Sequence, residues 1–382
     1  MKRFDGLDIA RGVAIVLMFL SHTVKGLLSY EQMPDFAILP IHTLTKFSST
    51  LFFLVFGVSL GMFFVRHVGT TRWPAKRNHL LLRALVVLLS YKALCFVQMF
   101  QTYSGPEVLA TLGYLNFPDF AEVLNFYSFA IVWITFLLPL WVRIPLAVKP
   151  ILVIGLWQAG QYLEATLEFG DFWPIKAILC EQRGAYCFGQ LQRGAIALLG
   201  LTLGEYLQRA TFYEQWVLHR RRLFAVLLSL TVLCLCTFLY LGDFDPDRLQ
   251  AMLWDISHNV GKHPPDLVFM SFSLGGATLI LAACLYLNEG GLLFAPLSIL
   301  GKESLLCFNL HLGIIFIGYR YLLDLRGAVT YGQSLFLFAG VWGAALLLAP
   351  LNVRRKATAA KYAKAYRKLK KQRENQRHAR SH

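Results

Sequence analysis

Repeated apolar runs of about twenty residues constrain this chain more than any other feature of its sequence. The first run, from Ile9 to Leu28, has the length that an α-helix needs to cross the ~30 Å hydrocarbon core of a bilayer. Hydrophobic residues make up 56% of the 382 residues, and the mean hydropathy is +0.52. Soluble domains do not have this composition. The sequence therefore predicts an all-α, polytopic integral membrane protein.

The apolar runs follow one another with short connections, and they predict about ten transmembrane helices. These cover residues 9–28, 43–65, 84–103, 121–142, 150–168, 188–208, 223–241, 266–287, 297–319 and 333–351. No connection is long enough to hold a folded domain, so an active site has to be built from the helices. We expect residues 1–352 to form the transmembrane domain and residues 353–382 to form a basic cytoplasmic tail.

The distribution of charge predicts the orientation and the partners of the tail. The net charge is +15, and twelve Lys or Arg residues lie between Arg354 and His382. With the N-terminus in the cytoplasm, the inner connections carry more Lys and Arg, as the positive-inside rule requires. An even number of spans also returns the tail to the cytoplasm. There the tail favours anionic lipid over nucleic acid, because no nucleic-acid-binding motif accompanies the charge.

Two further features of the sequence leave alternatives open. The spacing of Tyr362, Tyr366 and Leu369 in the tail is compatible with an amphipathic surface helix, and the composition is equally compatible with disorder. Cys180 and Cys187 flank a polar loop, and they are compatible with a disulfide if that loop faces an oxidising compartment. The histidines of the long outer loop, His258 and His263, lack a third ligand at zinc spacing, so we expect no metal site.

Ionisable residues on the first apolar run form the leading candidate site. Arg11 and His22 are eleven residues apart, which places them within roughly 20° of one helical face and about 16 Å apart along the axis. Asp8 lies on the same side, one turn before Arg11. Ionisable groups inside a membrane are costly and usually functional. The alternative is that Asp8 and Arg11 anchor the helix at the interface and His22 is a core histidine.

Motifs in the first two runs resemble a known superfamily. Leu7–Ala14 reads LDIARGVA and is followed by His22, so that an arginine and a histidine are separated by ten residues. Phe52–Leu60 reads FFLVFGVSL. Both segments resemble the transmembrane acyltransferase superfamily. It includes the acyltransferase-3 proteins, the glucan succinyltransferases and the heparan glucosaminide acetyltransferases.

Weaker matches extend the resemblance along the chain. Leu300–Leu305 reads LGKESL and is followed by His311, similar to a late helix of the superfamily. Lys262–Asp266 reads KHPPD and is similar to a segment of the heparan acetyltransferase-like branch, with Asp266 in place of a serine. Leu82-Arg83, at the end of the basic loop of residues 66–82, resembles the arginines that open the third helix.

The resemblance implies O-acyl transfer from cytoplasmic acyl-CoA, with an acetyl or succinyl group, to a hydroxyl of a glycan or other envelope acceptor on the outer side. A bacterial inner membrane is the expected location. The implied donor-binding residues are Arg11, Arg77 and Arg83, which would meet the phosphates of coenzyme A. Arg77 is alternatively a solvated charge that sets topology.

The same resemblance implies the residues that carry the reaction. His22 would be the general base, with Asp8 pairing Arg11. His311 or Ser304 would donate a hydrogen bond to the oxyanion, and the alternative for His311 is a packing role in the core.

Two other classes of function are compatible with buried charges in a membrane protein. One is a transporter or flippase for a sugar or a lipid-linked intermediate, in which the charges line a pathway. The other is a non-catalytic partner in an envelope complex. Against transport, the sequence has no repeated halves and no matching pair of broken helices.

Overall fold

The computed structural model describes residues 5–35, 38–99, 104–185, 187–212, 216–286 and 291–380. Within these ranges the structure consists of helices joined by turns and loops and contains no strand. Eight helical segments are long and apolar enough to cross a membrane. The all-α, polytopic architecture predicted from the sequence is confirmed.

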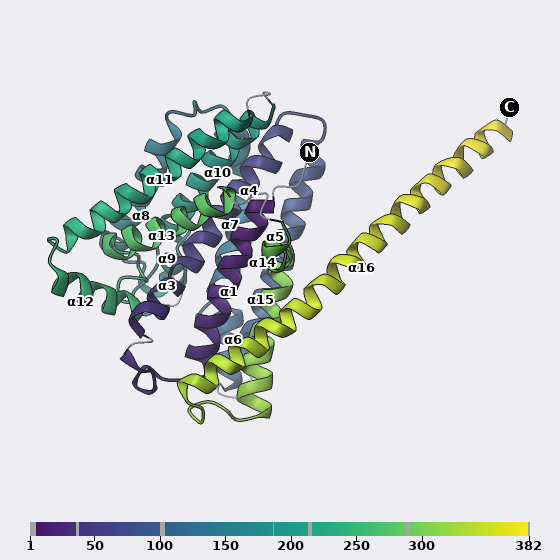
Figure 1. Cartoon of the computed structure of the whole chain (residues 1–382). Helices are drawn as coiled ribbons and strands as arrows, with labels where there is room; N and C mark the ends of the chain where they lie inside the picture. The colour runs from purple at the N-terminus through teal and green to yellow at the C-terminus, as the bar shows by residue number, and fades with distance from the viewer. Residues whose placement is uncertain are drawn as a thin grey trace.

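The main helices form a bundle in which the first helix runs through the middle (Figure 1). They are α1 (Asp5–Leu27), α4 (Phe47–Phe63), α5 (Trp73–Met99), α7 (Glu122–Trp141), α8 (Lys149–Thr166), α10 (Gln192–Phe212), α11 (Trp216–Leu241), α13 (Leu267–Tyr286), α14 (Ala295–Lys302), α15 (Ser304–Gly313), the π-helix η6 (Ile314–Leu322) and α16 (Tyr331–Arg380). Shorter helices cap the bundle: α3 (Thr43–Thr45), α6 (Gly105–Leu112), α9 (Trp173–Cys180) and α12 (Pro246–Ser257).

All ten predicted apolar runs are helical, but two of them are not among the eight candidate spans. These two are α8 and α10. α10 is buried along most of its length and carries polar side chains inside the bundle, including Arg193 and Glu205. Hydropathy alone therefore does not mark it as a span. The count of ten and the cytoplasmic side of the termini stay predictions.

The predicted run 297–319 is not one continuous helix. It consists of α14 and α15, which are separated at Glu303, and of η6, in which the helix widens. Glu303 accepts hydrogen bonds from Asn352 and Lys356 of α16 at 2.5 and 2.6 Å. The break is thereby tied to the last helix, and α15 begins inside the bundle.

Helix packing in the centre depends on close backbone contact. α4 crosses α10 so closely that a Cβ atom added at Gly57 would overlap the carbonyl of Ala197, and one added at Gly200 would overlap that of Leu54. Small residues permit this approach between helices in membranes. α1 packs against α4, α13, α14 and α16. These contacts place the polar residues of α1 among the other helices of the bundle.

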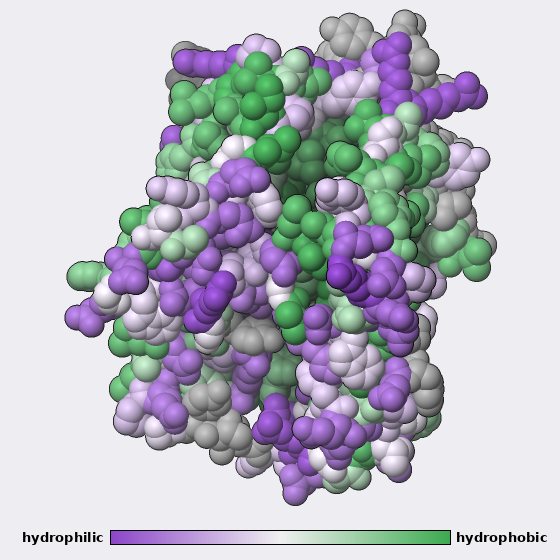
Figure 2. Space-filling model, turned by 90° about the vertical axis from the view of Figure 1, so that its left-hand side faces the viewer, coloured by the Kyte–Doolittle hydropathy of each residue, from purple (hydrophilic) through white to green (hydrophobic). Residues whose placement is uncertain are grey.

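The outward faces of α5, α11 and α16 are apolar, as lipid contact requires. Exposed large hydrophobic residues on them include Leu82, Leu85, Leu89, Phe96, Val232, Leu233, Leu235, Phe336, Leu347 and Leu351. On the face shown in Figure 2, hydrophobic side chains gather toward the upper part and hydrophilic ones toward the lower part.

α16 continues without interruption from the last predicted span into the tail. The predicted boundary between residues 352 and 353 lies inside this helix, which projects away from the bundle in Figure 1. α1 begins and α16 ends toward the same end of the molecule. The side chains of Tyr362, Tyr366 and Leu369 lie outside the described part, as do residues 100–103 and 287 at the ends of two predicted runs.

Candidate active site

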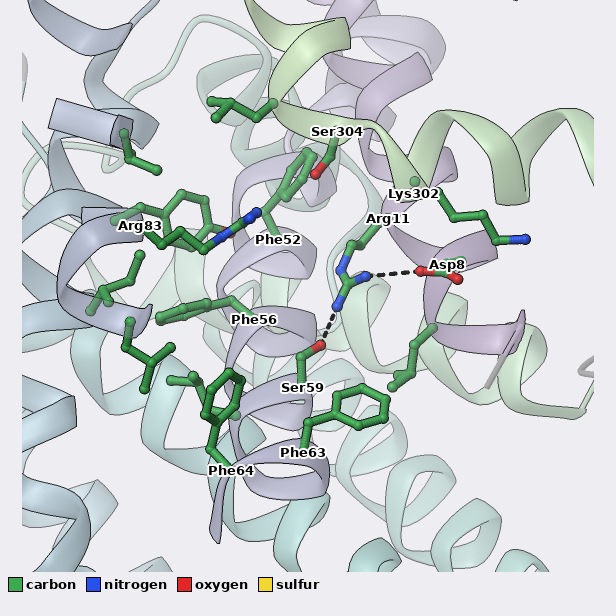
Figure 3. Close-up of a pocket in the computed structure, with 18 of the residues that line it drawn as sticks. Asp8, Arg11, Phe52, Phe56, Ser59, Phe63, Phe64, Arg83, Lys302 and Ser304 are labelled. Atoms are coloured by element: carbon green, nitrogen blue, oxygen red, sulfur yellow. Dashed lines mark hydrogen bonds and ion pairs between the residues drawn. The ribbon is translucent and has the colours of Figure 1, made fainter. Parts of the chain in front are cut away.

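A cavity of about 620 Å³ opens beside the first turns of α1 (Figure 3). We call it the arginine cavity, because Arg11, Arg66 and Arg83 line it together with Lys302 and His79. Its walls come from α1, α4, α5, α7, α14 and α15. Aromatic side chains line much of the remaining surface: Phe52, Phe56, Phe63, Phe64, Tyr127 and Phe308. The cavity therefore combines several cationic groups with an apolar, aromatic lining.

Arg11 is held in the arginine cavity by two side chains. Its Nη1 atom donates to Oδ1 of Asp8 at 2.9 Å, and its Nη2 atom donates to Oγ of Ser59 on α4. The predicted pairing of Asp8 with Arg11 is present. Ser59 belongs to the FFLVFGVSL segment, and the sequence alone does not indicate a role for it. Together the two contacts fix the direction of the guanidinium in the cavity.

Close packing of α1 on α14 holds the same region in place. A Cβ atom added at Gly12 would overlap the backbone of Leu297, and one added at Gly301 would overlap the carbonyl of Asp8. The glycine that follows Arg11 and the glycine of the LGKESL segment thus let two backbones meet beside the cavity. This contact positions Asp8 and Arg11 relative to Lys302.

We expect Gly301→Ala to destabilise the protein, because the added methyl group meets backbone rather than a flexible side chain. Overpacking of this kind costs about 1–3 kcal/mol or more. The matched control is Gly332→Ala on α16, where nothing lies within 4 Å of the added atom. Thermal unfolding of the two purified variants in detergent measures the difference. Equal stability of both variants would contradict the described contact of α1 with α14.

The predicted donor-binding arginines do not all reach the arginine cavity. Arg11 and Arg83 line it, whereas Arg77 is not among its lining residues. Arg66 and His79 line it and were not singled out from the sequence. The basic segment 66–82, whose second half forms the first turns of α5, was the available signal, but its sequence does not reveal which charged side chains face a cavity.

His22 and His311 form a direct contact in the centre of the bundle. Nδ1 of His22 lies 2.9 Å from Nε2 of His311, and the two rings are stacked with their centroids 5.1 Å apart. Nδ1 of His311 lies 3.1 Å from the carbonyl oxygen of Cys307. Because a carbonyl only accepts, Nδ1 of a neutral His311 carries the proton and Nε2 accepts from His22. Nε2 of a neutral His22 is then an unprotonated base.

Ser304 lies apart from this histidine pair. It is the first residue of α15 and lines the arginine cavity (Figure 3), while His311 lies two turns further along the same helix. At 1.5 Å per residue, the two positions are about 10 Å apart along the axis. Although Ser304 and His311 share a helical face, they are too far apart to contact the same reacting atom.

A second cavity, of about 330 Å³, lies toward the opposite end of α1. We call it the lysine cavity, because Lys25, Lys46 and Lys262 line it. His22 also lines it, three residues before Lys25 on α1. Val123 lines both cavities, and Phe308 of the arginine cavity packs edge-on against His22 and His311 with centroids 6.3 and 5.1 Å away. The two cavities therefore approach each other at the histidine pair.

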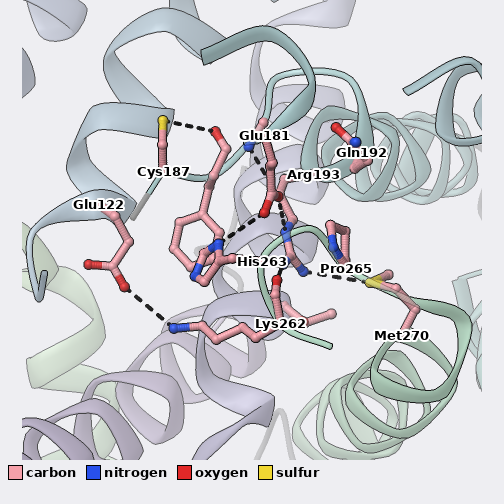
Figure 4. A network of polar contacts seen from close by, with 12 residues as sticks. Glu122, Glu181, Cys187, Gln192, Arg193, Lys262, His263, Pro265 and Met270 are labelled. Atoms are coloured by element: carbon pink, nitrogen blue, oxygen red, sulfur yellow. Dashed lines mark hydrogen bonds and ion pairs between the residues drawn. The ribbon is translucent and has the colours of Figure 1, made fainter. Parts of the chain in front are cut away.

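A buried polar network supports one wall of the lysine cavity (Figure 4). Glu181 accepts hydrogen bonds from Nε of Arg193 at 3.0 Å and from Nδ1 of His263 at 2.9 Å. Arg193 also donates to the backbone carbonyl of Lys262. The Lys262 ammonium then reaches Oε1 of Glu122 at 3.5 Å. The network thus fixes the loop that presents Lys262.

Electrostatics explains why this network is stable inside the protein. Burial alone would raise the pKa of Glu181, but the charge of Arg193 and the hydrogen bond from His263 outweigh burial and hold that pKa below its usual value. Burial, followed by the charge of Lys262, lowers the pKa of His263. Glu181 is therefore a carboxylate and His263 a neutral donor at neutral pH.

The two cysteines that the sequence left open are both buried free thiols. Nδ2 of Asn125 donates to Sγ of Cys187 at 3.5 Å. Among the described residues, no group of three or more His, Cys, Asp or Glu side chains could hold a metal ion.

This fold and these cavities define an all-helical, polytopic membrane protein with polar sites inside its bundle. Residues 3–179 match the model of a family described as heparan-alpha-glucosaminide N-acetyltransferase, catalytic. The match supports a membrane acetyltransferase and favours that branch of the resemblance; it gives no specific support to the acyltransferase-3 family. It covers Arg11, His22 and Arg83 but ends before Ser304 and His311. A search of curated proteins found no match.

Proposed function

We propose that this chain is a membrane-bound acyltransferase that moves an acyl group from acyl-CoA to a hydroxyl of a glycan or another envelope acceptor. The observation that carries the proposal is the meeting of two cavities, from opposite ends of α1, at the His22–His311 pair. The family match over residues 3–179 supports acyl transfer as the reaction class. The donor enters the arginine cavity from the cytoplasm, and the acceptor enters the lysine cavity from the outer side.

The arginine cavity suits coenzyme A, which carries phosphates at one end and a long, thin arm at the other. Arg11, Arg66 and Arg83 contact the phosphates, since guanidinium groups bind phosphate through two parallel hydrogen bonds. The aromatic walls accommodate the less polar parts of the donor. A volume of about 620 Å³ is within the usual range for ligand pockets. Ser304 contacts the arm, while Arg77 is left without a donor contact.

His22 acts as the general base in a direct transfer. Its Nε2 takes the proton from the acceptor hydroxyl as that oxygen bonds to the thioester carbonyl carbon. The tetrahedral intermediate then collapses, the carbon–sulfur bond breaks, and the electron pair leaves on sulfur. The thiolate takes the proton from His22. The products are the acylated acceptor and free coenzyme A, and His22 is again neutral.

His311 positions His22 in this scheme rather than donating to the oxyanion. Its one proton lies on Nδ1, toward the carbonyl of Cys307, and its Nε2 accepts from His22. No N–H remains for a developing oxyanion. The role is that of the third group that orients a base, which fixes the tautomer of the imidazole that reacts. Asp8 acts through Arg11 in the same indirect way.

The acceptor nucleophile is a hydroxyl in this proposal, although the matched family is described by N-acetyl transfer to a glucosaminide. The test therefore includes both kinds of nucleophile. Proteoliposomes containing the protein are supplied with [14C]acetyl-CoA or [14C]succinyl-CoA together with glucose- or glucosamine-terminated oligosaccharides. We expect label in the oligosaccharide only with active protein. Uptake of an unacylated sugar without acyl-CoA, and no label transfer, would replace the proposal by a transporter or flippase.

A further inference from the structure

The lysine cavity gathers basic side chains from separate parts of the chain. Lys25 comes from α1, Lys46 from the junction of α3 with α4, and Lys262 from the loop before α13. Arg320 of η6 and Arg326 of the next loop also line it. Segments so distant in sequence place cationic groups in a volume of only about 330 Å³.

Acidic groups of the cavity do not balance this charge. Asp119 and Glu122 also line it, and the Oε1 atom of Glu122 is 3.5 Å from Lys262. Burial has the largest effect on the pKa of Asp119 and the negative charge of Glu122 the next largest; both raise it, to about 6. Even with both carboxylates ionised, the five basic side chains outnumber them.

Lys25 and Lys46 form no ion pair with a carboxylate among the described residues. Nζ of Lys46 donates to Oδ1 of Asn259, a neutral acceptor, at 2.6 Å, and its side chain is almost fully buried. Nζ of Lys25 lies 5.1 Å from the centre of the Tyr30 ring. An ammonium group inside a protein is costly unless an anion pairs with it. The two lysine side chains also contact each other, so an anionic ligand beside them would offset their charge.

We propose that the acceptor carries a phosphate or carboxylate group, which Lys25, Lys46 and Lys262 bind next to the reacting hydroxyl. This inference rests on the proposed acyl transfer and names the class of its acceptor. Lys25 follows His22 by three residues, a rise of about 4.5 Å along α1. The anionic group therefore lies on the same sugar as the reacting hydroxyl or on the adjoining unit. The oxyanion can belong to a soluble glycan or to a lipid-linked sugar.

Binding is measured on the full chain in phosphatidylcholine nanodiscs, with saturating coenzyme A to occupy the arginine cavity. The probes are glucose 6-phosphate, glucuronate and glucose. We expect the two anionic sugars to bind at least about tenfold more tightly than glucose, because charge-assisted hydrogen bonds are the stronger ones. The difference should shrink as salt is added. Competition by a polyprenyl phosphate in the nanodisc identifies a lipid-borne source, and its absence identifies a soluble one.

Variants locate the binding site without depending on one substitution. Lys262→Gln and Lys25→Gln should each lower the preference for anionic sugars about tenfold. Lys76→Gln, in the first turn of α5 and outside both cavities, should leave it unchanged. Equal binding of neutral and anionic sugars, absence of binding, or an intact preference in both lysine variants would overturn the inference. Acyl transfer with equal KM for neutral and anionic acceptors would overturn the inference of an anionic acceptor but not the proposed acyl transfer. A preference for anionic sugars without any acyl transfer would overturn the proposed function.

Discussion

His22→Ala is expected to lower the rate of acyl transfer by about 10²–10⁴-fold, the usual contribution of a general base. The variant loses the imidazole that lines the lysine cavity and contacts His311, so the acceptor hydroxyl keeps its proton during attack. The KM for acyl-CoA should change little, since the basic groups of the arginine cavity are untouched. Steady-state kinetics with labelled acetyl-CoA measures both quantities.

The matched control for this variant is His219→Ala. His219 lies on α11 and lines neither cavity, so the variant should transfer acyl groups at the parental rate. Protein abundance and thermal stability are measured for both variants, because loss of His22 must not act through folding. Full activity of a folded His22→Ala protein would remove His22 from the mechanism.

Arg11→Ala is expected to raise the KM for acyl-CoA by about 10- to 100-fold. Hydrogen bonds to charged groups contribute about 1.5–3 kcal/mol, and Arg11 is fixed toward the cavity by Asp8 and Ser59. Arg11→Lys should restore little affinity, because an ammonium cannot keep both contacts and also bind phosphate through two parallel bonds. The turnover number at saturating donor should fall much less than the affinity.

Arg72→Ala supplies the control for Arg11. Arg72 is an exposed arginine of the basic loop that lines neither cavity, so it reports the effect of removing one surface charge. Its effect on the KM for acyl-CoA should stay within about twofold at physiological salt, where exposed charges are screened. Similar losses in both variants would mean that Arg11 contributes only general charge.

The sequence predicted the local arrangement on α1 well but not the partners of its residues. The spacing of Arg11 and His22 gave their separation, and the structure places them in two different cavities. Ser59 and His311 could not be paired with them from the sequence, because these contacts join positions 48 and 289 residues apart. Contacts across such separations depend on the packing of helices, which a hydropathy pattern does not encode.

The helices themselves were predictable where they face lipid and less so where they face the core. α5 and α11 have apolar faces that point out of the bundle, and the sequence predicted an apolar run for each of them. α10 carries Arg193 and Glu205, whose charges are satisfied by Glu181 and Lys149 from other segments. The two residues of a buried ion pair lower the hydropathy of their segments in the sequence, although their charges offset each other in the folded protein. For the same reason, the lysine cavity could not be predicted: its basic residues come together only in the bundle.

The central claim is that a donor in the arginine cavity passes its acyl group directly to an acceptor that enters from the other side of the membrane, with His22 as the base. Proteoliposomes with uniform orientation test it directly, with [14C]acetyl-CoA added on the side of the arginine cavity and the acceptor oligosaccharide enclosed on the other. We predict labelled, acylated oligosaccharide inside the vesicles, and none with His22→Ala. Label transfer only when donor and acceptor are on the same side would contradict the account.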